Sequence, residues 1–181
     1  ASDVYKRQVH KLCEYKPAYA YLFPELVEGY DYWGYGDLDL IYGDLRHFLT
    51  EEVLSYEKIF TLGHLTLIKN KEKFNQMFLK KVDGVDFYRK AFSSTANFNF
   101  DEKFQDKVNI NTIFEDNDCK IWKKSYAADI YTKSSDFLLD IGDGTKEERR
   151  DSLFVWNKGN LYRYYDNKSG KIERQEFMYI H

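Results

Sequence analysis

Two aspartates, Asp37 and Asp39, form the short motif of this sequence whose spacing is best suited to chemistry. They follow an aromatic-rich stretch, residues 30–35, whose composition is typical of a buried strand. Alternate residues of an extended chain point to the same side, so both carboxylates would face the crevice where α/β folds bind ligands. Two hard oxygen donors there suit Mg²⁺ or Mn²⁺, although a solvated turn can carry the same residues.

A divalent ion at this position would serve enzymes that transfer a sugar from a nucleotide-sugar. The leaving group of such a reaction is a nucleoside diphosphate, and a metal ion on it neutralises the charge that develops as the bond breaks. A D-x-D motif alone is a weak signal, because three residues at this spacing arise often by chance. The prediction therefore depends on what surrounds the motif.

The surrounding segments resemble a bacterial family of polysaccharide-biosynthesis glycosyltransferases of GT-A type, over residues 10–181. The segments that carry the resemblance are KLCEYKPAY (11–19), GYDYWGYGDLDLIYGDL (29–45), FTLGHLTLIKN (60–70), FDE (100–102) and WNKGNLYRYY (156–165). The resemblance implies an α/β, partial GT-A-like fold with a mixed sheet and a β-hairpin-rich C-terminal part. It also implies a nucleotide-sugar donor, a UDP-sugar above all, and a polysaccharide or glycolipid acceptor.

The resemblance assigns roles on the donor side of the reaction. Asp37 and Asp39 match the metal-binding D-x-D, and His181 falls where a late histidine often supplies a third ligand to Mn²⁺ or Mg²⁺. Lys11 and Lys16 precede the motif by about one helix, where a basic residue commonly contacts the donor. A solvated helix start remains the alternative for the two lysines, and a terminal residue without a role is the alternative for His181.

Four further residues match the acceptor side of the same family. Asp101 and Glu102 correspond to the late acidic pair, and in an inverting enzyme one of them would be the general base that deprotonates the acceptor hydroxyl. Gly63 and His64 open the strand that would line the acceptor site, so both are expected to bind substrate. An exposed acidic loop and a structural histidine are the competing readings.

The chain also departs from the family pattern. Glu14 stands where Asp is commoner, and Gly36 where Cys is commoner. The strands that bind the nucleotide are expected to be missing ahead of the motif, so residues 9–181 are predicted to be one GT-A-like domain truncated at both ends. Residues 1–8 are similar to translated sequencing adapter and are expected to be a non-native tail.

The elements that must position these residues follow from local patterns. Helices and strands alternate early and strands dominate after residue 121, which predicts an α/β protein with a mixed sheet. Strands are predicted at 58–62, 65–69, 152–156, 160–165 and 171–180, helices at 71–81 and 110–115, a short helix capped by Asp44, and an irregular excursion at 82–108.

Composition limits the other functions that the chain can have. The 181 residues include 27 basic and 30 acidic side chains, a balance that argues against a nucleic-acid partner. No apolar run reaches the length of a transmembrane segment. The two cysteines are isolated, so we expect a reducing, cytoplasmic location, with a peripheral position at the inner membrane left open.

Two non-enzymatic readings compete with the glycosyltransferase reading. A carbohydrate-binding module would stack sugars on aromatic side chains such as Trp156, Tyr162 and Tyr164 and would need no metal. A structural or interaction domain would use the D-x-D motif only as a turn. The enzyme reading predicts metal dependence, and these alternatives do not.

Overall fold

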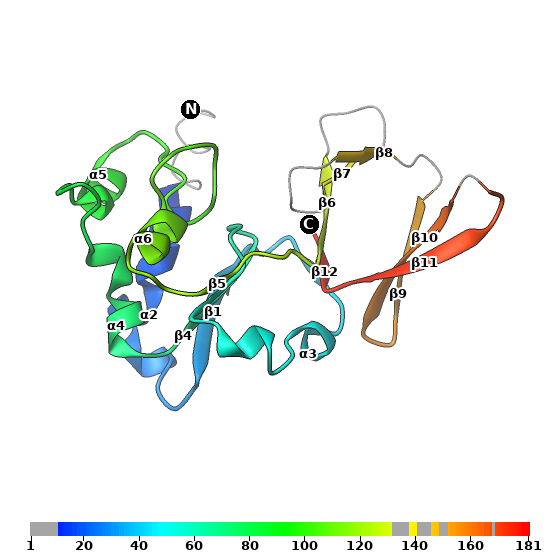
Figure 1. Ribbon diagram of the computed structural model, residues 1–181, viewed down its shortest axis with the longest axis horizontal. Coiled ribbons are helices and arrows are strands. Elements are labelled where there is room, and N and C mark those ends of the chain that lie inside the picture. The colour runs from blue at the N-terminus through cyan, green and yellow to red at the C-terminus, as the bar shows by residue number, and fades with distance from the viewer. Residues whose placement is uncertain (1–10, 132–137, 141–145, 149–151, 168) are drawn as a thin grey trace. The chain divides into compact units, whose positions relative to one another are not determined.

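The computed structural model describes residues 11–131, 138–140, 146–148, 152–167 and 169–181, and the expected tail at residues 1–8 lies outside this set. The described chain is a mixed α/β protein with mixed sheets (Figure 1). It divides into two compact units. The first unit comprises Ala1–Asp37 and Ser55–Lys123, and the second comprises Leu38–Leu54 and Lys124–His181.

The first unit contains a four-stranded mixed sheet in the order β1-β4-β3-β5. Its strands are β1 (Tyr32–Gly36), β3 (Lys58–Ile59), β4 (Leu65–Lys69) and β5 (Ile121–Trp122). Strand β4 is antiparallel to β1 and β3, whereas β3 is parallel to β5. The strand predicted at 65–69 is confirmed with the same bounds, and the one predicted at 58–62 is real but ends at Ile59.

Short helices supply the rest of the first unit. They are η1 (Lys16–Ala18), α2 (Tyr19–Leu22), η2 (Pro24–Leu26), α4 (Glu72–Asn75), η4 (Met77–Leu79), α5 (Phe87–Ser93) and α6 (Ile110–Asp116). The short helix η3 (Val53–Ser55) contains the point in the sequence, after Leu54, where the chain returns to the first unit. The helix predicted at 110–115 is confirmed as α6, which begins at a capping box on Asn109.

Two predictions about this unit were wrong. The helix predicted over 71–81 breaks at Gln76 into α4 and η4, although its predicted face is correct because Phe74, Met77 and Phe78 are all buried. The stretch 82–108 is not wholly irregular, because it contains α5. Helix α5 is held by packing that local sequence does not reveal: the Phe92 ring stacks on Tyr15, 77 residues away, with 4.3 Å between centroids.

The second unit contains a five-stranded mixed sheet in the order β2-β12-β6-β7-β8. Its strands are β2 (Ile41–Tyr42), β6 (Ala127–Tyr131), β7 (Leu138–Asp140), β8 (Lys146–Glu148) and β12 (Tyr179–Ile180). Strand β12 is antiparallel to β2 and parallel to β6. Helix α3 (Leu45–Phe48) follows β2, and the Asp44 carboxylate accepts bonds from the amides of Arg46 and His47, which confirms the predicted cap.

An antiparallel meander completes the second unit. Strands β9 (Ser152–Asn157), β10 (Asn160–Asp166) and β11 (Ile172–Phe177) pair in the order β11-β10-β9, which confirms the predicted hairpins. The first hairpin turns at Lys158 and Gly159, whose φ angles of 50° and 89° match a two-residue turn that favours glycine. The inner face of the meander packs Leu161 and Phe177 into a small core.

None of the helices in the described part of the chain combines the length and the apolar character that crossing a bilayer requires.

Candidate functional site

The first unit gathers three other predicted site residues around the ammonium group of Lys16. Its Nζ lies 2.5 Å from Asp37 Oδ1 and 3.3 Å from Asp101 Oδ2, and it donates to the Gly63 carbonyl at 3.2 Å. Lys16 is buried at the start of η1, and Asp37 directly follows β1. These residues are 21 to 85 positions apart in sequence, so the fold alone brings them together.

Asp101 is the most unusual acid of this cluster, because only 4% of its surface is exposed. Burial raises its pKa to about 7; the Lys16 charge opposes this change, and the Glu102 charge adds to it. The pKa of Lys16 is itself raised, because its bond to Asp37 and the charges of the two aspartates outweigh the effect of burial. Asp101 can therefore change its protonation near neutral pH, as a general base must.

Gly63 and Glu102 lie beside Asp101 and limit the space around its carboxylate. The Gly63 amide donates to Glu102 Oε2 at 3.3 Å, and Asn99 Nδ2 donates to Glu102 Oε1 at 3.2 Å. A Cβ atom added at Gly63 would lie 2.7 Å from Asp101 Oδ2. Residue 63 must therefore remain without a side chain for both carboxylates to keep these positions.

Glu14 holds the backbone that leads into the acidic pair Asp101 and Glu102, a role that the sequence did not predict. Its buried carboxylate accepts bonds from three consecutive amides, those of Phe98, Asn99 and Phe100, at 2.6, 3.1 and 2.9 Å. This arrangement fixes the backbone directly before Asp101. The only sequence signal was the position of Glu14 within the family-like segment 11–19.

Lys11 and His64, the two remaining predicted substrate ligands of the first unit, have other contacts in the structure. Lys11 Nζ donates to the carbonyl oxygens of Ala91 and Ala96, beside helix α5. The His64 carbonyl accepts a bond from the Asp37 amide at 3.0 Å, which places this histidine at the end of the D-x-D strand. A contact of either side chain with substrate stays a prediction.

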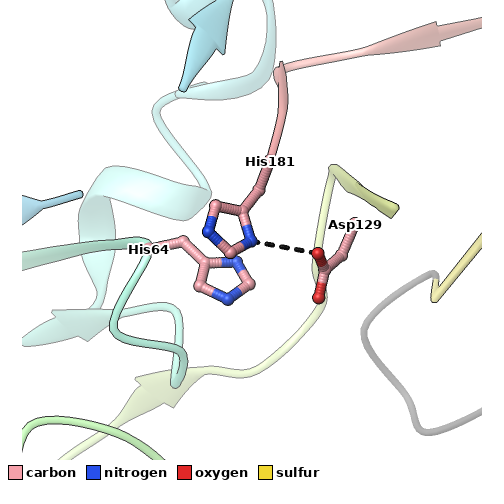
Figure 2. Close-up of side chains that lie close together, drawn as sticks. All are labelled: His64, Asp129 and His181. Carbon is pink, nitrogen blue, oxygen red and sulfur yellow. Dashed lines mark hydrogen bonds and ion pairs between the residues drawn. The ribbon is translucent and has the colours of Figure 1, made fainter. Parts of the chain in front are cut away.

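The second unit brings Asp39 and His181 together with an acid that the sequence reading missed. His181 Nδ1 lies 3.0 Å from Asp129 Oδ1, as Figure 2 shows, and His181 Nε2 lies 3.8 Å from Asp39 Oδ1. The histidine is fixed by its backbone, because its amide donates to Ala128 and its carbonyl accepts from Ile130, both at 2.9 Å. Its side chain is 27% exposed, and that of Asp39 is 78% exposed.

The chemistry of this donor set fits a divalent metal. A carboxylate on Nδ1 leaves Nε2 as the ligand atom, and metal-binding histidines usually have their other ring nitrogen hydrogen-bonded to such a carboxylate. His181 Nε2 and Asp39 Oδ1 would then be the two groups of the second unit that hold such an ion. Asp129 had no motif around it, but an acid in the otherwise apolar stretch AADI of β6 is a signal that sequence reading could have used.

The aromatic side chains named for a binding module do not share one surface of the meander. Directly paired residues point to the same face of a sheet, and Trp156 pairs with Leu161 whereas Tyr162 pairs with Val155. Tyr162 and Tyr164 therefore lie on one face and Trp156 on the other. No stacking platform can include all three.

Comparison with known proteins places the chain in a family. The model of a family described as a family of unknown function, DUF6625, matches residues 2–181. The chain belongs to this family. No curated protein matches the chain, and no solved structure matches it.

Proposed function

We propose that this protein is a metal-dependent glycosyltransferase with a GT-A-like fold. It would transfer a sugar from a nucleotide-sugar donor, a UDP-sugar above all, to a polysaccharide or glycolipid acceptor. The observation that carries the proposal is the arrangement of Asp39, His181 and Asp129, in which an oriented imidazole and an exposed carboxylate lie at the D-x-D motif. The resemblance over residues 10–181 supports the same reading.

The metal, Mn²⁺ or Mg²⁺, would be held by Asp39 and His181. Asp37, two residues earlier in the chain, is the remaining ligand that the resemblance implies, and its Oδ1 contacts Lys16 in the first unit. When bound, the ion would neutralise the diphosphate of the leaving group. Asp129 would hold the His181 ring so that Nε2 faces the ion.

The acidic pair of the first unit would handle the acceptor. Asp101, with a pKa of about 7, would take the proton of the acceptor hydroxyl, and Glu102 would anchor the acceptor. We assign Lys16 to holding Asp37 and Asp101 rather than to binding donor phosphate, because both carboxylates already contact its ammonium group. A cytoplasmic location, with peripheral access to a lipid-linked acceptor, belongs to the same proposal.

The proposal is tested by hydrolysis and transfer assays on the protein across a panel of nucleotide-sugars. We expect turnover with Mn²⁺ that chelator abolishes and that Asp39→Asn lowers about 100-fold or more, as the loss of a metal ligand should. Asp118→Asn is the matched control, because Asp118 is exposed and its φ of 54° suits asparagine.

The contrary result is also informative. A folded protein that hydrolyses no donor, with or without metal, and whose Asp39→Asn variant binds Mn²⁺ as wild type does, would remove the enzyme reading. A non-catalytic carbohydrate-binding or structural domain would then be the better description.

A further inference from the structure

A cleft of about 360 Å³ lies on the first unit, formed by residues that take no part in the proposed reaction. This volume falls in the range of small-molecule sites, which are mostly apolar with a few polar groups. One wall comes from α2 and η2 and the other from β1 and the turn before it. The cleft is lined by Tyr19, Phe23, Leu26, Val27, Tyr30, Tyr32, Trp33 and Gly34.

The lining is dominated by aromatic rings that remain open to solvent. Tyr30 is 68% exposed, Phe23 46% and Tyr19 36%, which is unusual for side chains of this size gathered in one hollow. Aromatic faces bind the apolar face of a sugar ring, and tyrosine hydroxyls can bond to its hydroxyl groups. The cleft offers both kinds of group.

A network of amide side chains holds the cleft in shape. Asn70 Nδ2 donates to the carbonyls of Val27 and Tyr30 at 2.6 and 2.9 Å. Asn75 Nδ2 donates to Asn70 Oδ1 at 2.8 Å, and Asn75 Oδ1 accepts the Trp33 indole N–H at 2.9 Å. Three lining residues are thus tied to one pair of asparagines, so the site is formed before a ligand arrives.

The charge around the cleft argues against an anionic ligand. Residues 17–45 contain no Lys, Arg or His, whereas Glu25, Glu28 and Asp31 lie within the stretch that forms the walls. Among the described residues, Lys69 Nζ lies 6.0 Å from the centre of the Tyr32 ring, and the charge of Lys16 acts on Tyr19. A nucleotide or an acidic sugar would meet more negative than positive charge here, and a neutral, hydroxyl-rich ligand would not.

The edge of β1 supplies backbone groups to the same hollow. The Asp37 amide donates to His64 and the Asp31 carbonyl accepts from Asn70, so odd-numbered residues of this strand turn toward β4. Gly34 therefore directs its amide and carbonyl to the outer side, where the described residues include no further strand. Of the β1 residues whose backbone groups point outward, Tyr32 and Gly34 line the cleft, a length that is short for pairing with another strand and sufficient for one ring.

We propose that this cleft is a binding site for a neutral saccharide, with one ring stacked between the aromatic walls and its hydroxyls bonded to tyrosine and Gly34. The site requires no metal and does not involve the acidic cluster or His181. It goes beyond the proposed transferase activity and can exist without it. If that activity is established, the cleft is a subsite for the acceptor glycan.

The test measures binding of neutral disaccharides (cellobiose, maltose and chitobiose) to the full chain in the presence of chelator, by calorimetry and by the fluorescence of the tryptophans. We expect at least one to bind, and Tyr30→Ala or Phe23→Ala to weaken it about tenfold because each removes a stacking ring. Trp156→Ala, which removes an exposed aromatic of the second unit, should leave the affinity unchanged.

Other outcomes would overturn the proposal. Binding by none of the disaccharides, from protein whose variants and wild type share the same unfolding midpoint, would do so. Equal loss of affinity in Trp156→Ala, or preferential binding of UDP or glucuronic acid, would also contradict it. Concentration-dependent self-association that Tyr30→Ala abolishes, with no sugar binding, would mean that the edge of β1 pairs with a strand instead. Because chelator is present throughout, these results do not depend on the metal site, and they stay distinguishable from a failure of the proposed metal-dependent activity.

Discussion

The two units of this protein use carboxylates in opposite ways. In the first unit Asp101 is 4% exposed and lies against a buried lysine, so its charge depends on one ion pair in a medium with little water. In the second unit Asp39 and Asp129 flank His181 at the surface, where water can solvate all three. The same side-chain chemistry therefore gives a group with a raised pKa in one place and a set of water-accessible carboxylates beside an imidazole in the other.

The largest expected effect is on the stability of the first unit. Lys16→Met removes the cation that faces Asp101, and we expect the free energy of unfolding at pH 8 to fall by about 3 kcal/mol, because a buried charge is left without a partner. The loss should be smaller at pH 5, where Asp101 can take up a proton. Urea denaturation at both pH values measures the difference.

Two further variants sharpen this result. Lys16→Met combined with Asp101→Asn should recover part of the lost stability. His181→Gln in the second unit should change it by less than about 1 kcal/mol, because water can reach this side chain and replace its contacts. An unchanged free energy of unfolding in Lys16→Met would show that Asp101 does not depend on its ion pair with Lys16, and the proposed difference between the two units would be wrong.

The second expected effect is the pH dependence of stability that Asp101 confers. Its pKa of about 7 in the folded protein exceeds the ordinary 3.8, so between these values the folded state holds a proton that the unfolded chain has released. Stability should fall as pH rises from about 4 to 7, by on the order of 3 kcal/mol, and Asp101→Asn should lack this contribution.

Buried Lys58 has the opposite effect on stability, at pH values above 7. Burial lowers its pKa to about 7, so the unfolded chain binds the extra proton between pH 7 and 10.5 and stability should rise there. Denaturation of wild type and Asp101→Asn from pH 4.5 to 7 therefore isolates the Asp101 contribution. Parallel curves for the two proteins over that range would contradict the raised pKa.

The smallest expected effect concerns Asp129 in the second unit and depends on the proposed metal site. Asp129→Asn should lower the affinity for Mn²⁺ about tenfold by weakening the bond that orients His181, with little change in stability. Calorimetric titration with Mn²⁺ measures it, with Asp118→Asn as control. Equal affinities in wild type and Asp129→Asn would show that Asp129 does not support a ligand.

Much of the local structure could be predicted because it depends on residues close in sequence. The C-terminal hairpins follow from alternation and turn residues, the strand at 65–69 from its apolar pattern, and helix α3 from the cap at Asp44. Local patterns failed where packing decides. The helix expected over 71–81 breaks at Gln76, and α5 forms within a polar stretch because Phe92 packs on Tyr15.

By itself, the sequence determined which residues deserved attention, including the D-x-D motif, the acidic pair and the late histidine, together with most of the strands. Only the tertiary structure decided their partners. Lys16 meets Asp101 across 85 residues and His181 meets Asp129 across 52, and neither separation has a sequence signature. Protonation and ligand geometry depend on burial and on groups within a few ångströms, and a folded chain sets both through contacts that are remote in sequence.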